Sequence, residues 1–145
     1  MEKQTHKEKY PYSANLFRFC RQVLDARYGK QRIMDQDVGK ILQLDATDCS
    51  HWKTGKKNIH SVKYMKALAA GLQLNERIIN DIAVGELTDV EAIAELYDYD
   101  ETLQDKSMIE KSKSEFFRHN AEFWSKQKET EFQENFIINS KKIDL

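Results

Sequence analysis

The chain has 145 residues, of which 32% are charged and 40% hydrophobic, and its formal net charge is −1. Its length fits one compact domain with an appendage, and its composition excludes collagen-like, Pro/Gly-rich disordered and disulfide-framework proteins. Because it lacks both a run of about 18 apolar residues and a secretory signal, and has only two cysteines, we expect no membrane span, reduced thiols and a cytoplasmic protein.

The small net charge conceals two halves of opposite sign. Residues 1–66 contain 14 Lys and Arg against 7 Asp and Glu, whereas residues 67–145 contain 9 against 17. A basic half is attracted to polyanions whatever the total charge is. The alternative, that both halves are ordinary solvated surface, stays open at this point.

The first half of the chain is expected to form five short helices. Apolar residues repeat at helical spacing from Leu16 to Leu24, with Ser13 as the expected N-cap and Gly29 as the expected stop. The other four are expected at 36–42 after Asp35, at 46–53 after Asp45, at 62–70 between Ser61 and Gly71, and at 76–84 between Asn75 and Gly85. Gly71 is expected to close its helix in the left-handed conformation. No stretch alternates with period two, so the predicted fold class is all-α.

Residues 88–145 are predicted to form a helical C-terminal region. Thr88 and Glu91 make a capping-box pattern that starts a sixth helix running to about Tyr97, and the aspartates at 98 and 100 indicate a break. Residues 101–133 lack Gly and Pro, and their apolar residues fit one narrow stripe of a long helix. The aromatic side chains of this region have three open interpretations: packing back on the domain, a homodimer interface, or binding of another protein.

The most informative window is 35–59, with the sequence DQDVGKILQLDATDCSHWKTGKKNI. Two short helices separated by a tight turn at 43–45 have the arrangement of a helix-turn-helix. The spacing turns six apolar residues inward, with the small Gly39 where the helices cross: Val38, Ile41, Leu42, Leu44, Cys49 and Trp52. The second helix keeps small or polar residues outside, as a groove-reading face requires: Ala46, Thr47, Asp48, Ser50, His51 and Lys53.

The stretch 44–56, LDATDCSHWKTGK, resembles the phage-repressor (Cro-like, XRE-type) helix-turn-helix family, and the resemblance extends over about residues 14–87. It implies a five-helix DNA-binding domain at 14–87, a flexible basic arm at 1–13 and a helical C-terminal extension at 88–145. It also implies a sequence-specific transcriptional regulator of repressor type. Its expected partner is double-stranded DNA, bound as a homodimer through the C-terminal helices, because a two-fold dimer reads a palindrome.

The resemblance also assigns roles to individual residues of the motif. The base-reading positions of the helix at 46–53, which would lie in the major groove, fall on Ala46, Thr47 and His51. The phosphate-binding positions fall on the loop after this helix and on the first helix: Arg21, Thr54, Lys56, Lys57 and Asn58. Lysines 3, 7 and 9 of the N-terminal arm are further candidates for phosphate contacts. An alternative interpretation is also open, in which Lys56 and Lys57 belong to a solvated loop and His51 is an ordinary surface residue.

Three residues depart from the family pattern. Gln43 stands where the family has glycine, which predicts a positive φ at a non-glycine residue. Lys53 replaces the usual Glu after Trp52, so the internal Arg–carboxylate pair is expected to be missing and Arg21 to be free for phosphate. Asp35 replaces a phosphate-contacting Gln, and its carboxylate is expected to repel DNA.

No sequence pattern for catalysis is present. The chain has no HExxH sequence, nucleophile elbow or phosphate-cradling glycine loop, and His6, His60 and His119 lack partners at metal-ligand spacing. We therefore expect no enzyme, no metal and no cofactor. The rival hypothesis is a protein-interaction adaptor, or an antitoxin, whose aromatic C-terminal helix binds a protein partner. Asp35, Asp48 and the acidic second half favour that rival, and the loop lysines oppose it.

Overall fold

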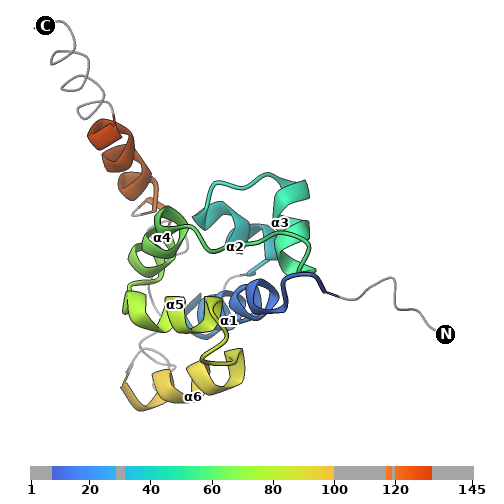
Figure 1. Ribbon diagram of the computed structural model, residues 1–145. Coiled ribbons are helices and arrows are strands. Elements are labelled where there is room, and N and C mark those ends of the chain that lie inside the picture. Colours follow the sequence, from blue (N-terminus) through green and yellow to red (C-terminus); the bar gives the residue numbers. More distant parts are fainter. Residues whose placement is uncertain (1–7, 29–31, 100–116, 119, 132–145) are drawn as a thin grey trace, which may run out of the picture.

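The computed structural model describes residues 8–28, 32–99, 117–118 and 120–131, and all regular secondary structure in them is helical. The helices are α1 (Pro11–Tyr28), α2 (Asp35–Ile41), α3 (Ala46–Lys53), α4 (Val62–Leu72), α5 (Glu76–Ala83) and α6 (Asp89–Tyr99). A further helix is formed by residues 120–131 (Figure 1). The predicted all-α fold class is confirmed for this part of the chain. None of these helices combines the length and the apolar composition that a membrane crossing needs.

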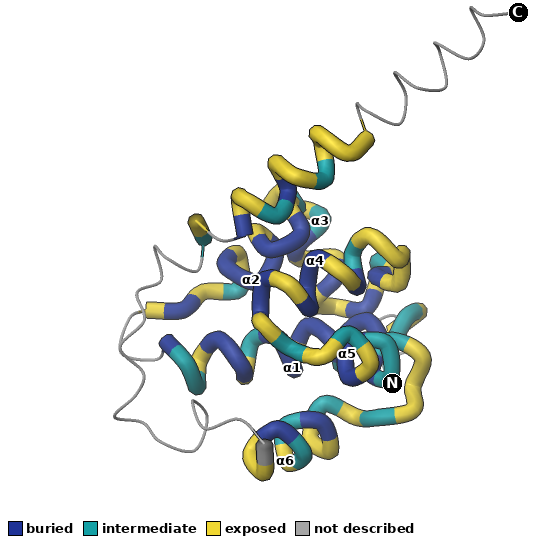
Figure 2. The backbone as a smooth tube through the Cα atoms, turned by 90° about the vertical axis from the view of Figure 1, so that its left-hand side faces the viewer, coloured by how far each residue is buried: buried dark blue, intermediate teal, exposed yellow. Residues whose placement is uncertain are grey.

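Helix α1 is the centre of the fold. It packs against each of the helices α2 to α6, and its apolar side chains from Leu16 to Leu24 are almost completely buried. The edge of Phe17 meets the Trp52 ring of α3, with 5.1 Å between ring centroids. Figure 2 shows the buried residues of α1 and α4 inside the molecule and the exposed ones on the outer turns. The contact with α1 therefore helps to set the orientation of α3.

Two helices begin earlier than predicted. Helix α1 starts at Pro11, whose fixed φ and missing N–H suit a first helical position, so Ser13 is not the N-cap. Ser13 is buried inside α1, where its Oγ accepts the Ile59 N–H at 2.9 Å and so ties the loop after α3 to α1. Helix α2 starts at Asp35 itself, so the prediction that Asp35 is the N-cap is wrong. The N-cap is Met34, and the Asp37 carboxylate in the first turn accepts its N–H at 2.8 Å, as the third helical residue of a capping box does.

The prediction that Gly71 closes its helix is wrong. Helix α4 continues to Leu72, and the residue in the left-handed conformation is Gln73, with φ 55°. A Cβ atom on Gly71 would lie 3.0 Å from Ile41 Cγ2 and 3.2 Å from Asn120 Nδ2. Glycine at this position therefore lets α2 and the helix 120–131 approach α4 closely.

The remaining predicted N-caps are confirmed. Each cap side chain accepts a backbone N–H of the first turn: Asp45 from Asp48 at 2.8 Å, Ser61 from Tyr64 at 3.2 Å, and Asn75 from Arg77 at 2.8 Å. Thr88 and Glu91 exchange both bonds of the capping box. Helix α6 runs to Tyr99, two residues further than predicted, so no break occurs at Asp98. Asp100, the other residue of the predicted break, and Gly29, the predicted stop of the first helix, lie outside the described residues.

The helix 120–131 packs back against the domain. Trp124 is 6% exposed, and its Nε1 donates to the Ile41 carbonyl at 2.8 Å, while Asn120 Nδ2 donates to the same oxygen at 3.1 Å. At the rim, Lys63 Nζ lies 2.6 Å from the Glu131 carboxylate. Of the three open interpretations of the aromatic region, packing back therefore holds for these residues. The other parts of the predicted long helix, including Phe132 to Ile138, lie outside the described residues.

Candidate nucleic-acid interface

Helices α2 and α3 are joined by a tight turn. Gln43 has φ 57°, which confirms the predicted positive φ, and the Leu44 N–H donates to the Gly39 carbonyl at 3.0 Å. A Cβ atom on Gly39 would lie 2.6 Å from Cys49 Sγ, so only glycine allows the two helices to cross this closely. The turn and the crossing together fix α3 relative to α2.

The inner face of α3 is anchored in the core. Trp52 is fully buried, and its Nε1 donates to the Ser13 carbonyl of α1 at 2.8 Å. Cys49 is 5% exposed, and its thiol donates to the Asp35 carbonyl of α2 at 3.3 Å. The core roles predicted for Trp52 and Cys49 are confirmed. Because two helices hold the inner face, the outer face of α3 has a defined direction.

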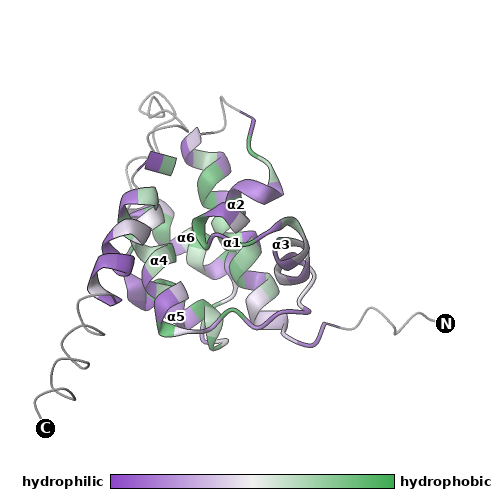
Figure 3. Ribbon diagram, turned by 90° about the horizontal axis from the view of Figure 1, so that it is seen from above, coloured by the Kyte–Doolittle hydropathy of each residue, from purple (hydrophilic) through white to green (hydrophobic). Residues whose placement is uncertain are grey.

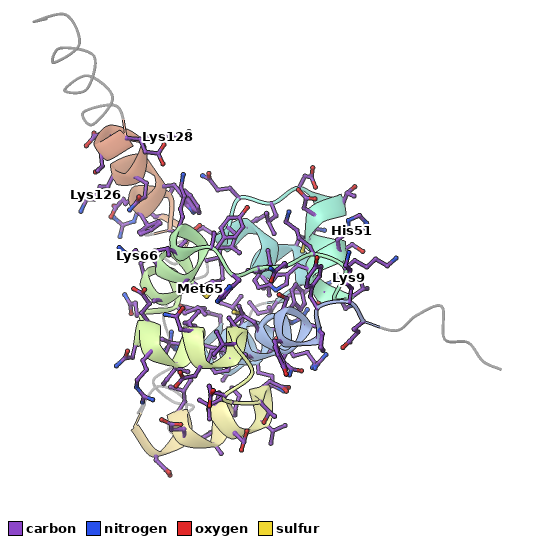
Figure 4. All side chains as sticks on the ribbon, viewed as in Figure 1. Lys9, His51, Met65, Lys66, Lys126 and Lys128 are labelled. Atoms are coloured by element: carbon purple, nitrogen blue, oxygen red, sulfur yellow. The ribbon has the colours of Figure 1, made fainter. Side chains whose placement is uncertain are left out.

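The outer face of α3 carries the predicted base-reading residues. Ala46, Thr47 and His51 are all exposed, and within the described part of the chain the Thr47 and His51 side chains make no hydrogen bond or ion pair. Figure 4 shows His51 on the outer side of α3, and the colouring of Figure 3 shows α3 as mostly hydrophilic. The structure thus places the three residues on one accessible helix, with the polar side-chain groups of Thr47 and His51 free to bond.

The loop 54–58 folds over the end of α3. The His51 carbonyl accepts the backbone N–H groups of Lys56 at 2.8 Å and Lys57 at 3.1 Å, and Gly55 has φ 75°. The Lys56 side chain is exposed and Lys57 is half-buried. Neither lysine forms an ion pair with any other residue that the structure describes. Two cationic side chains therefore stand unpaired beside the outer face of α3.

Two other predicted phosphate ligands of this loop are partly used within the protein. The Thr54 hydroxyl donates to the Ser50 carbonyl at 3.0 Å, so its proton is held in the last turn of α3. The Asn58 Oδ1 accepts the Ser13 hydroxyl at 3.4 Å, which leaves its amide N–H groups as donors. Of the two, Asn58 keeps the group that a phosphate oxygen requires.

The expectation that Arg21 lacks a carboxylate partner is wrong. Its Nη1 lies 2.5 Å from Asp35 Oδ1, and its Nε lies 3.2 Å from Asp25 Oδ2. Its third nitrogen, Nη2, donates to the Ile33 carbonyl at 2.8 Å. The resemblance implies a carboxylate partner of Arg21 only at position 53, where this chain has lysine, and so Asp35 was not predicted as the partner.

Lys53 is bound to the same carboxylate. Its Nζ lies 2.6 Å from Asp35 Oδ2, so Asp35 stands between two cations, one from α1 and one from α3. The signal in the sequence was the joint departure at 35 and 53, where a carboxylate appears at one position and a lysine at the other. The two residues form an ion pair across the α2–α3 contact.

The N-terminal segment lies beside the same loop. The Tyr10 N–H donates to the Gly55 carbonyl at 2.8 Å, and Figure 4 shows Lys9 on the same side of the molecule as His51. Residues 11–13, which the prediction assigned to the basic arm, belong to α1. Residues 1–7, with Lys3 and Lys7, lie outside the described residues.

No family model, curated protein or solved structure shows significant similarity to the chain.

Among the residues that the structure describes, no three His, Cys, Asp or Glu side chains are grouped as ligands of a metal ion would be. The two cysteines are free and buried, and burial raises the pKa of both thiols above the ordinary value. Such thiols stay protonated near neutral pH, whereas reactive cysteines need the thiolate.

Proposed function

We propose that the chain is a sequence-specific DNA-binding transcriptional regulator of repressor type, with α2 and α3 as its helix-turn-helix. The observation that carries the proposal is the construction of α3. Its inner face is locked by Trp52 and Cys49, while its outer face presents small and polar side chains, among which Thr47 and His51 make no hydrogen bond with any described residue. A helix that enters the major groove needs a fixed direction and no bulk at its start.

The roles on α3 follow from the chemistry of the base edges. Thr47 offers a hydroxyl to a base or phosphate and a methyl group to thymine. His51 donates to the O6 or N7 atom of guanine, and Ala46 provides only apolar contact. Two polar readers make a short recognition code, which fits a module that reads one half-site of a palindrome as part of a homodimer.

The phosphate contacts are assigned to Lys56, Lys57 and Asn58. All three follow α3 directly and keep cationic or amide donors that no described residue uses. Such contacts position the protein on the duplex without reading its sequence. Arg21 and Thr54 are weaker candidates, because the guanidinium nitrogens and the hydroxyl proton are bound within the protein.

A pair of matched double variants tests the interface. In Lys56→Ala/Lys57→Ala we expect binding to a mixed-sequence duplex to weaken about tenfold and the salt slope to fall by about two units. The control, Lys126→Ala/Lys128→Ala, removes the same charge from exposed residues of the helix 120–131, on the other side of the molecule from His51 (Figure 4). Fluorescence anisotropy over a salt series measures both. Equal losses in the two variants would mean generic attraction by net charge and would contradict the assigned interface.

The rival function, an adaptor or antitoxin that binds a protein through its aromatic C-terminal helix, has less support. In the described part of this region, Trp124 and Asn120 are buried against α2 and α4 and both donate to Ile41. Their surface is thus occupied within the chain. The homodimer interface of the proposal must likewise come from residues other than these two.

A further inference from the structure

We infer that Asp35 limits the affinity of the interface for nucleic-acid phosphate by holding the cation of Lys53 within the protein, whereas Arg21 is also bound by Asp25 and the Ile33 carbonyl. This inference rests on the proposed function and adds to it a residue that acts through its neighbours. Each carboxylate oxygen of Asp35 binds one cation: Oδ1 lies 2.5 Å from Arg21 Nη1, and Oδ2 lies 2.6 Å from Lys53 Nζ.

The ion triad Arg21–Asp35–Lys53 lies at the edge of the outer face of α3. Lys53 is the last residue of α3, three and seven positions after Ser50 and Ala46, so all three lie along one side of the helix. The side chains of the triad are partly open to solvent, at 30%, 40% and 53% exposure for Arg21, Asp35 and Lys53. A phosphate that approaches α3 from outside therefore meets the triad at its rim.

The charge of this cluster explains its effect. With Asp25, which contacts Arg21 at 3.2 Å, two cations face two carboxylates, so the cluster adds no net positive charge to the interface. Carboxylate and phosphate oxygens compete for the same N–H donors, and both form charge-assisted hydrogen bonds with them. To contact phosphate, Lys53 must give up its bond to Asp35, which offsets most of the gain.

Removal of the carboxylate is expected to release Lys53 for phosphate. Asparagine keeps the size of Asp35 and one acceptor oxygen, so Asp35→Asn changes mainly the charge. One additional neutralised phosphate steepens the salt slope by about 0.9 and tightens binding about three- to tenfold near 0.1 M salt. The gain is the same for every DNA sequence, because phosphate contacts carry no sequence information. The native carboxylate thus keeps non-specific binding weak.

A purely structural role of Asp35, in which the triad only holds α1, α2 and α3 together, predicts the opposite effect on binding. If the triad mainly orients α3, loss of Asp35 misplaces Thr47 and His51 and weakens binding, and it does not steepen the salt slope. The slope thus separates the two roles, since a purely structural residue leaves the number of neutralised phosphates unchanged or lower.

The test is a set of salt titrations of a random-sequence duplex, followed by fluorescence anisotropy. The variants are Asp35→Asn, Asp35→Ser as a second way to remove the carboxylate, the double variant Asp35→Asn/Lys53→Met, and the control Glu129→Gln. Glu129 is exposed on the helix 120–131, so its variant has the same change of charge away from α3. We expect tighter binding and a steeper slope in Asp35→Asn and Asp35→Ser, a smaller change in Glu129→Gln, and return to the wild-type slope in the double variant.

The outcomes separate this inference from the proposed function. If the wild-type chain binds the duplex but neither Asp35 variant exceeds the gain of Glu129→Gln, the inference alone is overturned. If the double variant keeps the full gain, Lys53 is not the released cation and the inference is likewise overturned. If no form of the chain binds the duplex at the lowest salt, the proposed function is lost and the inference with it.

Discussion

Thr47 and His51 are exposed on α3, whereas Cys49 and Trp52 of the same helix are buried in the core. Thr47 or His51 can therefore be substituted without disturbing the fold. Both are exposed and unbonded within the described chain. We expect Thr47→Ala and His51→Ala each to cost about 1–3 kcal/mol of binding free energy on a preferred duplex and almost nothing on a random one. Anisotropy titrations with both duplexes measure the difference. Equal losses on both would show that these residues contact only the backbone.

Cys20 allows a prediction about pH. Its thiol is fully buried, and desolvation raises its pKa in the folded chain above the ordinary value. The unfolded chain loses this proton near pH 8.5 while the folded chain keeps it, so stability is complete below that pH and falls as the pH rises further. Between pH 7.5 and 9.5 we expect the free energy of unfolding of the wild type to fall about 1 kcal/mol more than that of Cys20→Ala. Urea unfolding at the two pH values checks this, and parallel curves would contradict it.

At the scale of elements, the helix 120–131 is part of the domain. Trp124 fills a site between α2 and α4 and, with Asn120, satisfies the carbonyl at the end of α2, a position that an isolated helix leaves unpaired. We expect Trp124→Ala to lower the free energy of unfolding by about 3–5 kcal/mol, and Trp124→Phe, which loses the N–H, by about 1–2 kcal/mol. Denaturant unfolding measures both, with Ser125→Ala on the exposed side of the same helix as the control. A change under about 0.5 kcal/mol in Trp124→Ala would mean that this helix is not docked.

The elements also show what the sequence can and cannot predict. Caps such as Asp45 and Asn75 and the capping box at Thr88 depend on neighbours within four residues, so the local sequence predicted them. The left-handed Gln43 was predicted from the resemblance, because it stands where that family has glycine. Ser13 and Gly71 were misread because their roles depend on distant partners, Ile59 for the first and Ile41 with Asn120 for the second. A local pattern gives no signal for such contacts.

The same limit applies to the candidate interface. The outer residues of α3 follow directly from helical spacing once Trp52 and Cys49 are placed inside, so their exposure was predictable. The pairing of Asp35 with Arg21 and Lys53 joins residues 14 and 18 positions apart. Prediction of these ion pairs requires the positions of α1, α2 and α3 relative to one another, and residue spacing within a single helix does not give them.

At the scale of the whole molecule, the asymmetry of charge along the sequence becomes an asymmetry in space. Helix α6 has no basic residue and contains Asp89, Glu91, Glu95 and Asp98, and it lies on the far side of α1 from α3 (Figure 1). The loop lysines Lys56 and Lys57 follow α3 on the near side. This placement of charge fits the proposal that a polyanion approaches the molecule from the side of α3.

Selection of preferred duplexes from a random pool, with the purified chain at two salt concentrations, tests whether α3 reads DNA sequence. We expect a two-fold symmetric motif that persists at the higher salt, because base contacts and a dimer supply part of the binding energy. Lack of enrichment, or binding that disappears at moderate salt, would contradict the claim and leave only generic attraction between a basic surface and a polyanion.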